Sequence, residues 1–538
     1  MPECFRSVLE RLDQDNELLH IRKPVDVRYI SPLIVQADKP VWFHDPIGFE
    51  VPVVSGLYWK RDRLARSLNW PESELGVRFP KGIQKMMDPV SVEEAPCQEV
   101  VKSGDEVDLT ELPIPFLGER DGGAFISAGV LLARGEEGVV NAGVYRLMYR
   151  SRNVTSVDLV TNSDLRKCYE AAFKRQEPLP IAVCIGVHPF EMLSAAFKAP
   201  PGVSEMNIAG GLHGEPVRTV PAKTNQLPVL ADCEIVLEGE IEPVGWTVDE
   251  GPFGDFAGMY TEVRWNPTFT VKTMTHRRNP LFQVIQMPWE NAWLGAVAME
   301  AQILEVLATA GVSTVAVRVT EGSACRWSVI ASIRKRAGGG KNALMAILSL
   351  PDTKHAVVVD EDVDIFDHEQ VEWAKTFRVQ ADQDVMIISG AQGKHIDPSL
   401  RAWELPRGQL PTTSKMGIDA TMSPDIPRAR FQRISYAFAN KVDAKSYLGD
   451  GAGSVDDAEA CDLDALAADI RIVVAEAPTY YSDLVEQFWA QGFHNVSQAL
   501  GRLHETNDLW QDDEGRICLK DSRYAADPPA TKLTNRSE

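Results

Sequence analysis

From about residue 105 to residue 290, short apolar runs alternate with glycine-containing and charged turns, and this pattern leaves few architectures open. Runs such as AFISAGVLLARGEEGVVNAGVYR are typical of antiparallel sheet. The next segment, residues 291–311, contains strong helix formers and no proline, so we expect one long helix that joins two domains. Apolar strands and helical segments alternate after it, which predicts a second domain of the α/β type.

These patterns indicate a mixed α/β fold class. Apolar residues at 5–20 have helical spacing and lead into an alternating strand, which is typical of a small α/β unit. The predicted regions are an N-terminal α/β region (1–104), a sheet domain (105–290), a linker helix (291–312), a C-terminal α/β domain (313–440) and a tail (441–538).

The tail is acidic and predominantly helical. Residues 441–538 contain nine Lys/Arg and nineteen Asp/Glu, a balance of 9 − 19 = −10. Three helical segments followed by a turn between two short strands have the outline of a winged-helix module. Because the acidity disfavours phosphate contacts, we expect this tail to pack on the protein or to bind a partner.

The composition excludes several partner classes. The chain has 538 residues, with 55 Lys plus Arg against 77 Asp plus Glu, and this net charge of −22 argues against nucleic acid and anionic membrane surfaces. Its eight cysteines are far apart and form no CxxC pair, which indicates free thiols in a reducing compartment. Without a secretory signal pattern or a run of about 18 apolar residues, we expect a cytoplasmic protein with no membrane span.

The most informative segment contains two acids around a compact turn. Glu250 and Asp255 are separated only by Gly-Pro-Phe-Gly, a spacer that can direct both carboxylates toward one small site. Two carboxylates in a closed pocket repel each other when both are ionised, so the pKa of one rises and that group can act as a general acid. The alternative for the turn alone is a surface loop with solvated acids.

The segment EIVLEGEIEPVGWTVDEGPFGDFAGMY resembles the signature of the UbiD-type decarboxylase family, whose members use prenylated FMN. The resemblance extends from FRSVLERLDQDNELLHIRKPVDV through NAGVYRLMY and PPGVSEMNIAGGLHGEPV to TSKMGIDAT, over roughly residues 5–425. It implies that residues 105–290 form a split β-barrel that binds the cofactor. It also implies that the C-terminal α/β domain mediates a homodimer or homohexamer, and that a flavin prenyltransferase supplies the cofactor.

The resemblance assigns roles to particular residues. It places Arg146, Glu250 and Asp255 in the catalytic group, with Asp255 as the proton donor to the carbon that loses CO2. Asn141 and Glu205 match ligands of a divalent metal at the cofactor phosphate, and hard oxygen donors of this kind suit Mn²⁺ or Mg²⁺. K⁺ is a further cation of the expected site. The residues expected to contact the cofactor are Asn141, Val144, Tyr145, Arg146, Ser163, Glu205 and Lys415.

The expected third metal ligand departs from the family pattern. Relatives have a histidine about eighteen residues after the arginine, whereas this sequence has Asp164 there. An aspartate can ligate a hard cation, so Asp164 is a candidate metal ligand. Equally, Asp164 can be the N-cap of the following helix, because aspartate is a preferred capping residue.

The resemblance implies a carboxy-lyase. The expected reaction is non-oxidative, reversible decarboxylation of an aromatic, heteroaromatic or α,β-unsaturated carboxylic acid, with CO2 as the second product. Protein side chains offer no electron sink for the charge left when CO2 departs from an sp² carbon, so a cofactor must supply it. The alternatives are an FMN-dependent oxidoreductase and a non-catalytic, partner-binding subunit.

Overall fold

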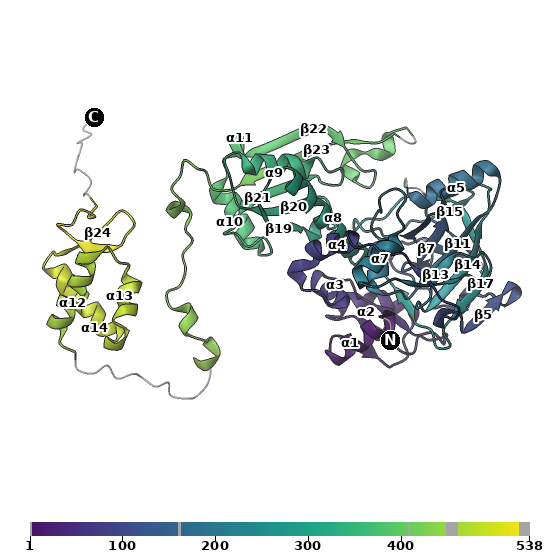
Figure 1. Cartoon of the computed structure of the whole chain (residues 1–538), viewed down its shortest axis with the longest axis horizontal. Helices are drawn as coiled ribbons and strands as arrows, with labels where there is room; N and C mark the ends of the chain where they lie inside the picture. Colours follow the sequence, from purple (N-terminus) through teal and green to yellow (C-terminus); the bar gives the residue numbers. More distant parts are fainter. Residues whose placement is uncertain (1–2, 160–162, 407–408, 448–460, 527–538) are drawn as a thin grey trace. The chain divides into compact units, whose positions relative to one another are not determined.

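The structure is a computed structural model that describes residues 3–159, 163–406, 409–447 and 461–526. The chain divides into two compact units, residues 1–423 and 424–538 (Figure 1). The first unit contains the sheet domain together with the N-terminal and C-terminal α/β regions, and it has a mixed α/β architecture. The predicted fold class is therefore confirmed.

The chain opens with helix α1 (Phe5–Gln14), which buries Phe5, Val8, Leu9 and Leu12 along one face. A four-stranded sheet of order β1-β2-β3-β18 follows, and its last strand comes from a distant part of the sequence. The strands are β1 (Leu19–Ile21), β2 (Val41–Phe43), β3 (Val53–Ser55) and β18 (Phe282–Val284), and the helices are α2 (Ile30–Gln36), α3 (Arg61–Leu68) and α4 (Leu75–Ile83).

The middle of the first unit is a nine-stranded sheet of order β6-β9-β10-β17-β14-β11-β7-β8, with β5 paired to β17. Its central strands are buried on both faces, and β11 pairs antiparallel with β14 from Leu179↔Ile241 to Ile185↔Ile235. The strands are β5 (Val100–Ser103), β6 (Phe125–Ile126), β7 (Val130–Arg134), β8 (Val140–Val144), β9 (Leu147–Ser151), β10 (Val154–Ser156), β11 (Leu179–Ile185), β14 (Ile235–Ile241) and β17 (Thr268–His276).

Smaller elements surround this sheet. One small sheet has the order β13-β12-β4, and β15 pairs with β16 beside the acidic turn. These strands are β4 (Val90–Ser91), β12 (Arg218–Pro221), β13 (Pro228–Leu230), β15 (Val248–Glu250) and β16 (Arg264–Asn266), and the helices are α5 (Asp164–Arg175), α6 (Pro189–Ala195) and α7 (Glu205–His213).

Helix α8 (Trp289–Thr309) occupies the position of the predicted linker helix, between the sheet domain and the C-terminal α/β region (Figure 1). It is long and apolar enough to cross a membrane by composition alone. However, Trp293, Leu294 and Ile303 on this helix are buried among the core residues of the first unit. Helix α8 is therefore a core helix of the first unit.

The C-terminal region of the first unit is a five-stranded mixed sheet of order β19-β20-β21-β23-β22. β20 pairs parallel with β21, and β21 with β23, whereas the edge strands β19 and β22 run antiparallel to their neighbours. The elements are β19 (Thr314–Val319), β20 (Ser328–Ile333), α9 (Gly339–Leu348), β21 (His355–Asp360), α10 (His368–Arg378), α11 (Ala381–Asp384), β22 (Val385–Gln392) and β23 (Thr412–Ala420).

The second unit has its own small core, which includes Leu466, Ile470, Leu484, Val496 and Leu500. Along the chain, the first helix is followed by Thr479, which forms an isolated β-bridge with Ile517. Two more helices and a pair of antiparallel strands come after it. The elements are α12 (Leu463–Glu476), α13 (Tyr481–Gln487), α14 (Phe493–Glu505), β24 (Leu509–Gln511) and β25 (Ile517–Leu519). This order matches the winged-helix outline that the sequence predicts.

Candidate active site

Arg146 lies between β8 and β9 and is surrounded by three carboxylates. Its Nε donates to Glu250 Oε1 at 2.7 Å, and its Nη1 donates to Asp255 Oδ2 at 3.2 Å. Its Nη2 lies 3.4 Å from Asp158 Oδ2. The structure thus brings together the three residues that the resemblance places in the catalytic group.

Glu250 ends strand β15 and is almost completely buried. Its Oε2 accepts hydrogen bonds from Ser156 Oγ at 3.1 Å and Asn266 Nδ2 at 2.6 Å. Burial raises the pKa of Glu250, the charge of Arg146 opposes this shift, and the charge of Asp158 adds to it. Desolvation is therefore the main cause of the raised pKa, rather than repulsion between the two acids of the turn.

A second loop holds the acidic turn in place. Asp121 Oδ1 accepts from the Gly254 backbone N–H at 2.7 Å, while its Oδ2 accepts from Gly118 N–H at 2.8 Å. The Gly122 N–H donates to Pro252 O at 2.8 Å, and a Cβ at Gly122 would lie 2.1 Å from the Gly251 carbonyl oxygen. Only glycine permits this approach of two backbones.

Asn141 and Glu205 meet at a second cluster. The Ala142 N–H donates to Glu205 Oε2 at 2.8 Å, and Asn141 Nδ2 lies 3.3 Å from Glu205 Oε1. Ser204 caps helix α7 and also donates to Val140 O at 2.6 Å, so it fixes the start of the helix against strand β8. The two predicted metal ligands are therefore adjacent.

This cluster fits a hard cation. Burial raises the pKa of Glu205 to about 7, and the charge of Asp164 adds to this shift. The Asn141 Oδ1 atom is buried and has no hydrogen-bond partner in the described part of the chain. An amide oxygen and a carboxylate left in this state are a donor set that Mn²⁺ or Mg²⁺ satisfies.

Ser163, and not Asp164, is the N-cap of helix α5, because its Oγ accepts from the Arg166 N–H. The capping alternative for Asp164 is therefore wrong, since the aspartate occupies the first helical position instead. Asp164 Oδ1 pairs with Lys167 Nζ at 2.5 Å, and its charge contributes to the raised pKa of Glu205. Its role as a metal ligand stays a prediction.

The other predicted cofactor contacts fall into two places. Tyr145 shares a hydrogen bond with the Ser163 side chain, and burial raises its pKa to about 12. Val144 ends strand β8 and pairs with Val130. Lys415 lies on β23 of the C-terminal region, where its buried ammonium donates to the carbonyls of Leu348 and Leu350 at 2.8 and 2.6 Å. These carbonyls hold Lys415 in the described structure, so its contact with the cofactor phosphate stays a prediction.

Sequence patterns did not reveal two members of the site. Asp158 pairs with Arg146 from the segment after β10, and Asp121 anchors the turn from a loop more than a hundred residues away. Neither residue belongs to a spaced motif, so only the fold relates them to the acidic turn.

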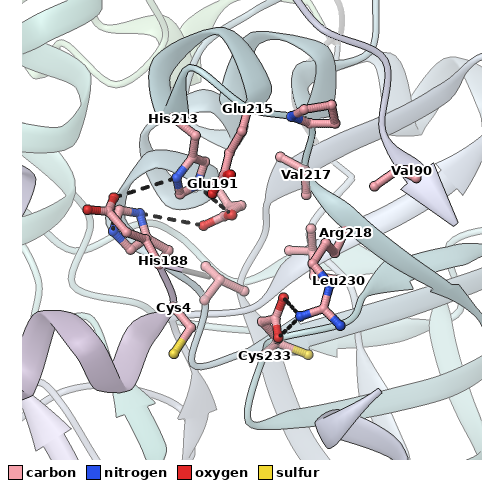
Figure 2. Close-up of a pocket in the computed structure, with 14 residues that line it drawn as sticks. Cys4, Val90, His188, Glu191, His213, Glu215, Val217, Arg218, Leu230 and Cys233 are labelled. Atoms are coloured by element: carbon pink, nitrogen blue, oxygen red, sulfur yellow. Dashed lines mark hydrogen bonds and ion pairs between the residues drawn. The ribbon is translucent and has the colours of Figure 1, made fainter. Parts of the chain in front are cut away.

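A separate buried cluster lies in a cavity of about 270 Å³ (Figure 2). His213 Nε2 lies 2.9 Å from Glu191 Oε1, and His188 lies beside both. The His188 Nδ1 atom accepts from the Phe190 N–H and so caps helix α6. Because this bond uses the Nδ1 lone pair, neutral His188 carries its proton on Nε2, and the cluster is a hydrogen-bonded network and not a ready metal site. None of Arg146, Glu250 and Asp255 lines this cavity.

Sequence profiles of 3-octaprenyl-4-hydroxybenzoate carboxy-lyase (UbiD) match three consecutive parts of the chain. The N-terminal domain profile matches residues 9–79, the Rift-related domain profile residues 89–288, and the C-terminal domain profile residues 292–420. The chain belongs to the UbiD family. Like the family members it matches, it is a carboxy-lyase, that is, a decarboxylase.

Individual relatives agree with this assignment. The anhydromevalonate phosphate decarboxylase of Methanosarcina mazei is 34% identical over 427 residues, which cover 78% of this chain and 96% of the relative. The UbiD-class enzyme HmfF from Pelotomaculum thermopropionicum, in complex with FMN, is 34% identical with a TM-score of 0.78, covering 83% of this chain and 100% of HmfF. The apo 3,4-dihydroxybenzoic acid decarboxylase AroY of Klebsiella pneumoniae is 27% identical, with a TM-score of 0.74 over 83% and 99% of the two chains.

Proposed function

We propose that this UbiD-family enzyme decarboxylates a conjugated carboxylic acid at the site formed by Arg146, Glu250 and Asp255. The contact of one guanidinium with both acids of the turn, across more than a hundred residues of sequence, carries this proposal. Among its relatives, one is named for an aromatic acid and one for a phosphorylated acid. Both names support a substrate that is aromatic, heteroaromatic or α,β-unsaturated.

The bound cofactor, prenylated FMN, supplies the electron sink for the charge that CO2 leaves behind. An evolved dimeric form of HmfF has been solved with prFMN, which supports this form of the flavin here. Asn141 and Glu205, with Asp164 nearby, would hold Mn²⁺ or Mg²⁺ at the cofactor phosphate. Val144, Tyr145, Ser163 and Lys415 would complete the cofactor contacts, and K⁺ is the further cation of this proposal.

Asp255 is the proton donor in this proposal. Its Oδ2 lies against Arg146 Nη1, and its Oδ1 accepts from the Phe256 N–H at 2.7 Å, so the carboxyl group has a fixed orientation. Glu250 holds the other edge of the guanidinium from a buried position. Arg146 and Glu250 therefore position Asp255, which delivers the proton to the carbon that loses CO2.

We further propose a homodimer or homohexamer formed by the C-terminal region, with a flavin prenyltransferase as the source of cofactor. All eight cysteines of the chain are free, which supports a reducing, cytoplasmic location. The acidic second unit falls outside the three matched family domains, and we propose that it packs on the enzyme or binds a partner.

The test is co-expression with a flavin prenyltransferase, anaerobic purification, and the absorbance and mass of the bound cofactor. Prenylated FMN together with CO2 release from a panel of conjugated acids supports the proposal. Unmodified FMN with hydride-transfer activity would favour the oxidoreductase, and an enzyme that binds no flavin would favour the partner-binding subunit.

A matched pair of variants tests the proton donor. Asp255→Asn keeps the size of the side chain and removes the acid, so CO2 release should fall by about 10²–10⁴-fold while the cofactor stays bound. Asp249→Asn changes an exposed carboxylate of the same segment, whose nearest cation is Arg150 at 3.5 Å, and should leave turnover unchanged. Unchanged turnover in Asp255→Asn would remove that residue from the mechanism.

A further inference from the structure

Arg326 reaches the acidic turn from the C-terminal region. It lies just before β20, and its Cζ is 4.6 Å from the centre of the Phe256 ring. Phe256 directly follows Asp255, and the same ring stacks on Trp327 with 5.8 Å between centroids and 13° between planes. Arg326 and Trp327 therefore contact the residue that directly follows the proposed proton donor.

The guanidinium of Arg326 lacks an anionic partner. Within the described ranges it makes no hydrogen bond and no ion pair within 4.0 Å, and its buried Nε atom is unsatisfied. Burial lowers the pKa of Arg326, and the more distant charges of Asp352 and Asp255 only oppose this shift. A partly desolvated cation is costly without a counterion, so this position favours an anion.

The backbone holds Arg326 in this position at an energetic cost. The two preceding residues, Ala324 and Cys325, have φ values of 53° and 55°, which non-glycine residues rarely adopt. On the other side, Gly295 of helix α8 leaves room for the guanidinium, because a Cβ there would lie 2.5 Å from Arg326 Nη2. Strained backbone of this kind is typical of functional positions.

Arg146 is already engaged by carboxyl groups and is not available to bind a further anion. Its guanidinium already contacts the carboxyl groups of Glu250, Asp255 and Asp158. Arg326, which lies over the adjacent Phe256 ring and has no ion pair among the described residues, is therefore a cation available to an anionic substrate that approaches Asp255.

We propose that Arg326 binds a second anionic group of the substrate, a carboxylate or a phosphate that survives the reaction. This inference rests on the decarboxylation site proposed above. The departing carboxylate is a poor candidate for this contact, because it loses its charge as CO2 forms. A cation bound to it would stabilise the substrate more than the transition state. A group that keeps its charge is bound with equal strength in the substrate and in the transition state, so its contact with Arg326 does not raise the activation barrier.

Five ligands of the prFMN-loaded enzyme test the inference by binding. Benzoate, terephthalate and 4-phosphonobenzoate share one ring and one carboxylate, and crotonate with glutaconate form a second, non-aromatic pair. Their affinities are measured by calorimetry and by quenching of tryptophan fluorescence, since Trp327 lies beside Arg326. CO2 release from the same acids is recorded in parallel.

We expect at least one of the two scaffolds to bind about ten- to a hundredfold more tightly as its dianion than as its monoanion. Arg326→Met should remove this preference, Arg326→Lys should retain part of it, and neither should change monoanion affinity. Arg334→Met removes the same charge from an arginine that pairs with exposed Glu361, and should change nothing. Terephthalate and phosphonobenzoate distinguish a dicarboxylic from a phosphorylated substrate.

Two results would overturn the inference. The first is an absence of dianion preference in the wild type on both scaffolds. The second is an equal loss of monoanion and dianion affinity in Arg326→Met, which would indicate a contact with the reacting carboxylate or a structural role. A dianion preference without CO2 release from any acid would instead count against the proposed reaction and leave the anion site standing.

Discussion

Asp121 and Gly254 are joined by a 2.7 Å hydrogen bond from the Gly254 backbone N–H to Asp121 Oδ1. The other carboxylate oxygen accepts from Gly118 N–H, so one side chain connects a distant loop to the acidic turn. The position of Asp255 therefore depends on a residue that lies outside the motif.

Replacing Asp121 by alanine should loosen the turn. Two partly buried N–H groups lose their acceptor, which costs about 1–3 kcal/mol of folding free energy. Because Asp255 immediately follows Gly254, we expect kcat/KM to fall at least tenfold. The measurement is CO2 release with thermal unfolding of the same preparation.

Asp121→Asn is the matched control, because asparagine keeps one acceptor oxygen for one of the two N–H groups. We expect it to retain more activity and stability than the alanine variant. A stability loss with unchanged kcat/KM in Asp121→Ala would show that the contact is structural only.

Glu205→Gln tests the cation site. The glutamine carbonyl can still accept from the Ala142 N–H, so the fold should persist, but the buried negative charge disappears. We expect divalent metal content to fall at least tenfold and prFMN retention after dialysis to fall with it. Metal analysis and flavin absorbance check this. A matched change at the exposed Glu215 should leave both unchanged, and full metal content in Glu205→Gln would exclude this carboxylate as a ligand.

Much of the fold is predictable because its signals are local. Helix α8 has an uninterrupted run of helix formers, and the predicted range of 291–312 nearly coincides with the observed one. Helix α7 was not predicted, since EMNIAGGLH contains two consecutive glycines. The fold uses them for contact, because a Cβ on Gly211 would lie 2.1 Å from Gly82 O on α4. Tertiary packing thus overrides helix propensity there.

Only those site residues that belong to a sequence motif could be predicted. Glu250 and Asp255 are linked by their spacing, and the resemblance adds Arg146. Asp158 and Arg326 come from separate segments, and no spacing relates them to the turn. Of the two roles left open for Asp164, the N-cap is wrong by one residue, because Ser163 and Asp164 are both good capping residues and only backbone geometry distinguishes them.

Acidification should destabilise the protein through His188. Burial lowers its pKa to about 3 from an ordinary 6.5, although the negative charge of Glu191 acts to raise it. The unfolded chain therefore takes up a proton below about pH 6.5 that the folded chain refuses. Stability should fall between about pH 6.5 and pH 3, by at most about 1.4 kcal/mol per pH unit from this group.

His188→Asn isolates this contribution. Asparagine supplies a capping acceptor for the Phe190 N–H but does not titrate, so denaturant midpoints should fall less steeply on acidification than in the wild type. The neighbouring pair acts differently. The pKa of His213 is raised and that of Glu191 is lowered, so their mutual stabilisation is lost as pH rises through the His213 value or falls through the Glu191 value. If the denaturant midpoints of His188→Asn and of the wild type fall equally steeply on acidification, the loss of stability does not come from His188.

Arg61 and Glu300 connect helix α3 to the linker helix α8 in the interior. The two guanidinium nitrogens donate to the two carboxylate oxygens at 2.6 and 2.9 Å, and both side chains are less than 10% exposed. Glu300→Met leaves a buried guanidinium without its carboxylate, so unfolding free energy should fall by about 3–5 kcal/mol. Urea denaturation at pH 7, followed by circular dichroism, measures this change.

The double variant Arg61→Met/Glu300→Met removes both charges and fills the space with apolar atoms. It should recover most of the lost stability, because desolvation of two charges offsets much of their attraction. The exposed pair of Glu74, the N-cap residue of α4, and Arg78 on that helix is the control, and removing it should cost no more than about 0.5 kcal/mol. If the double variant is no more stable than Glu300→Met, the cost of an unpaired buried charge is not the cause of the lost stability.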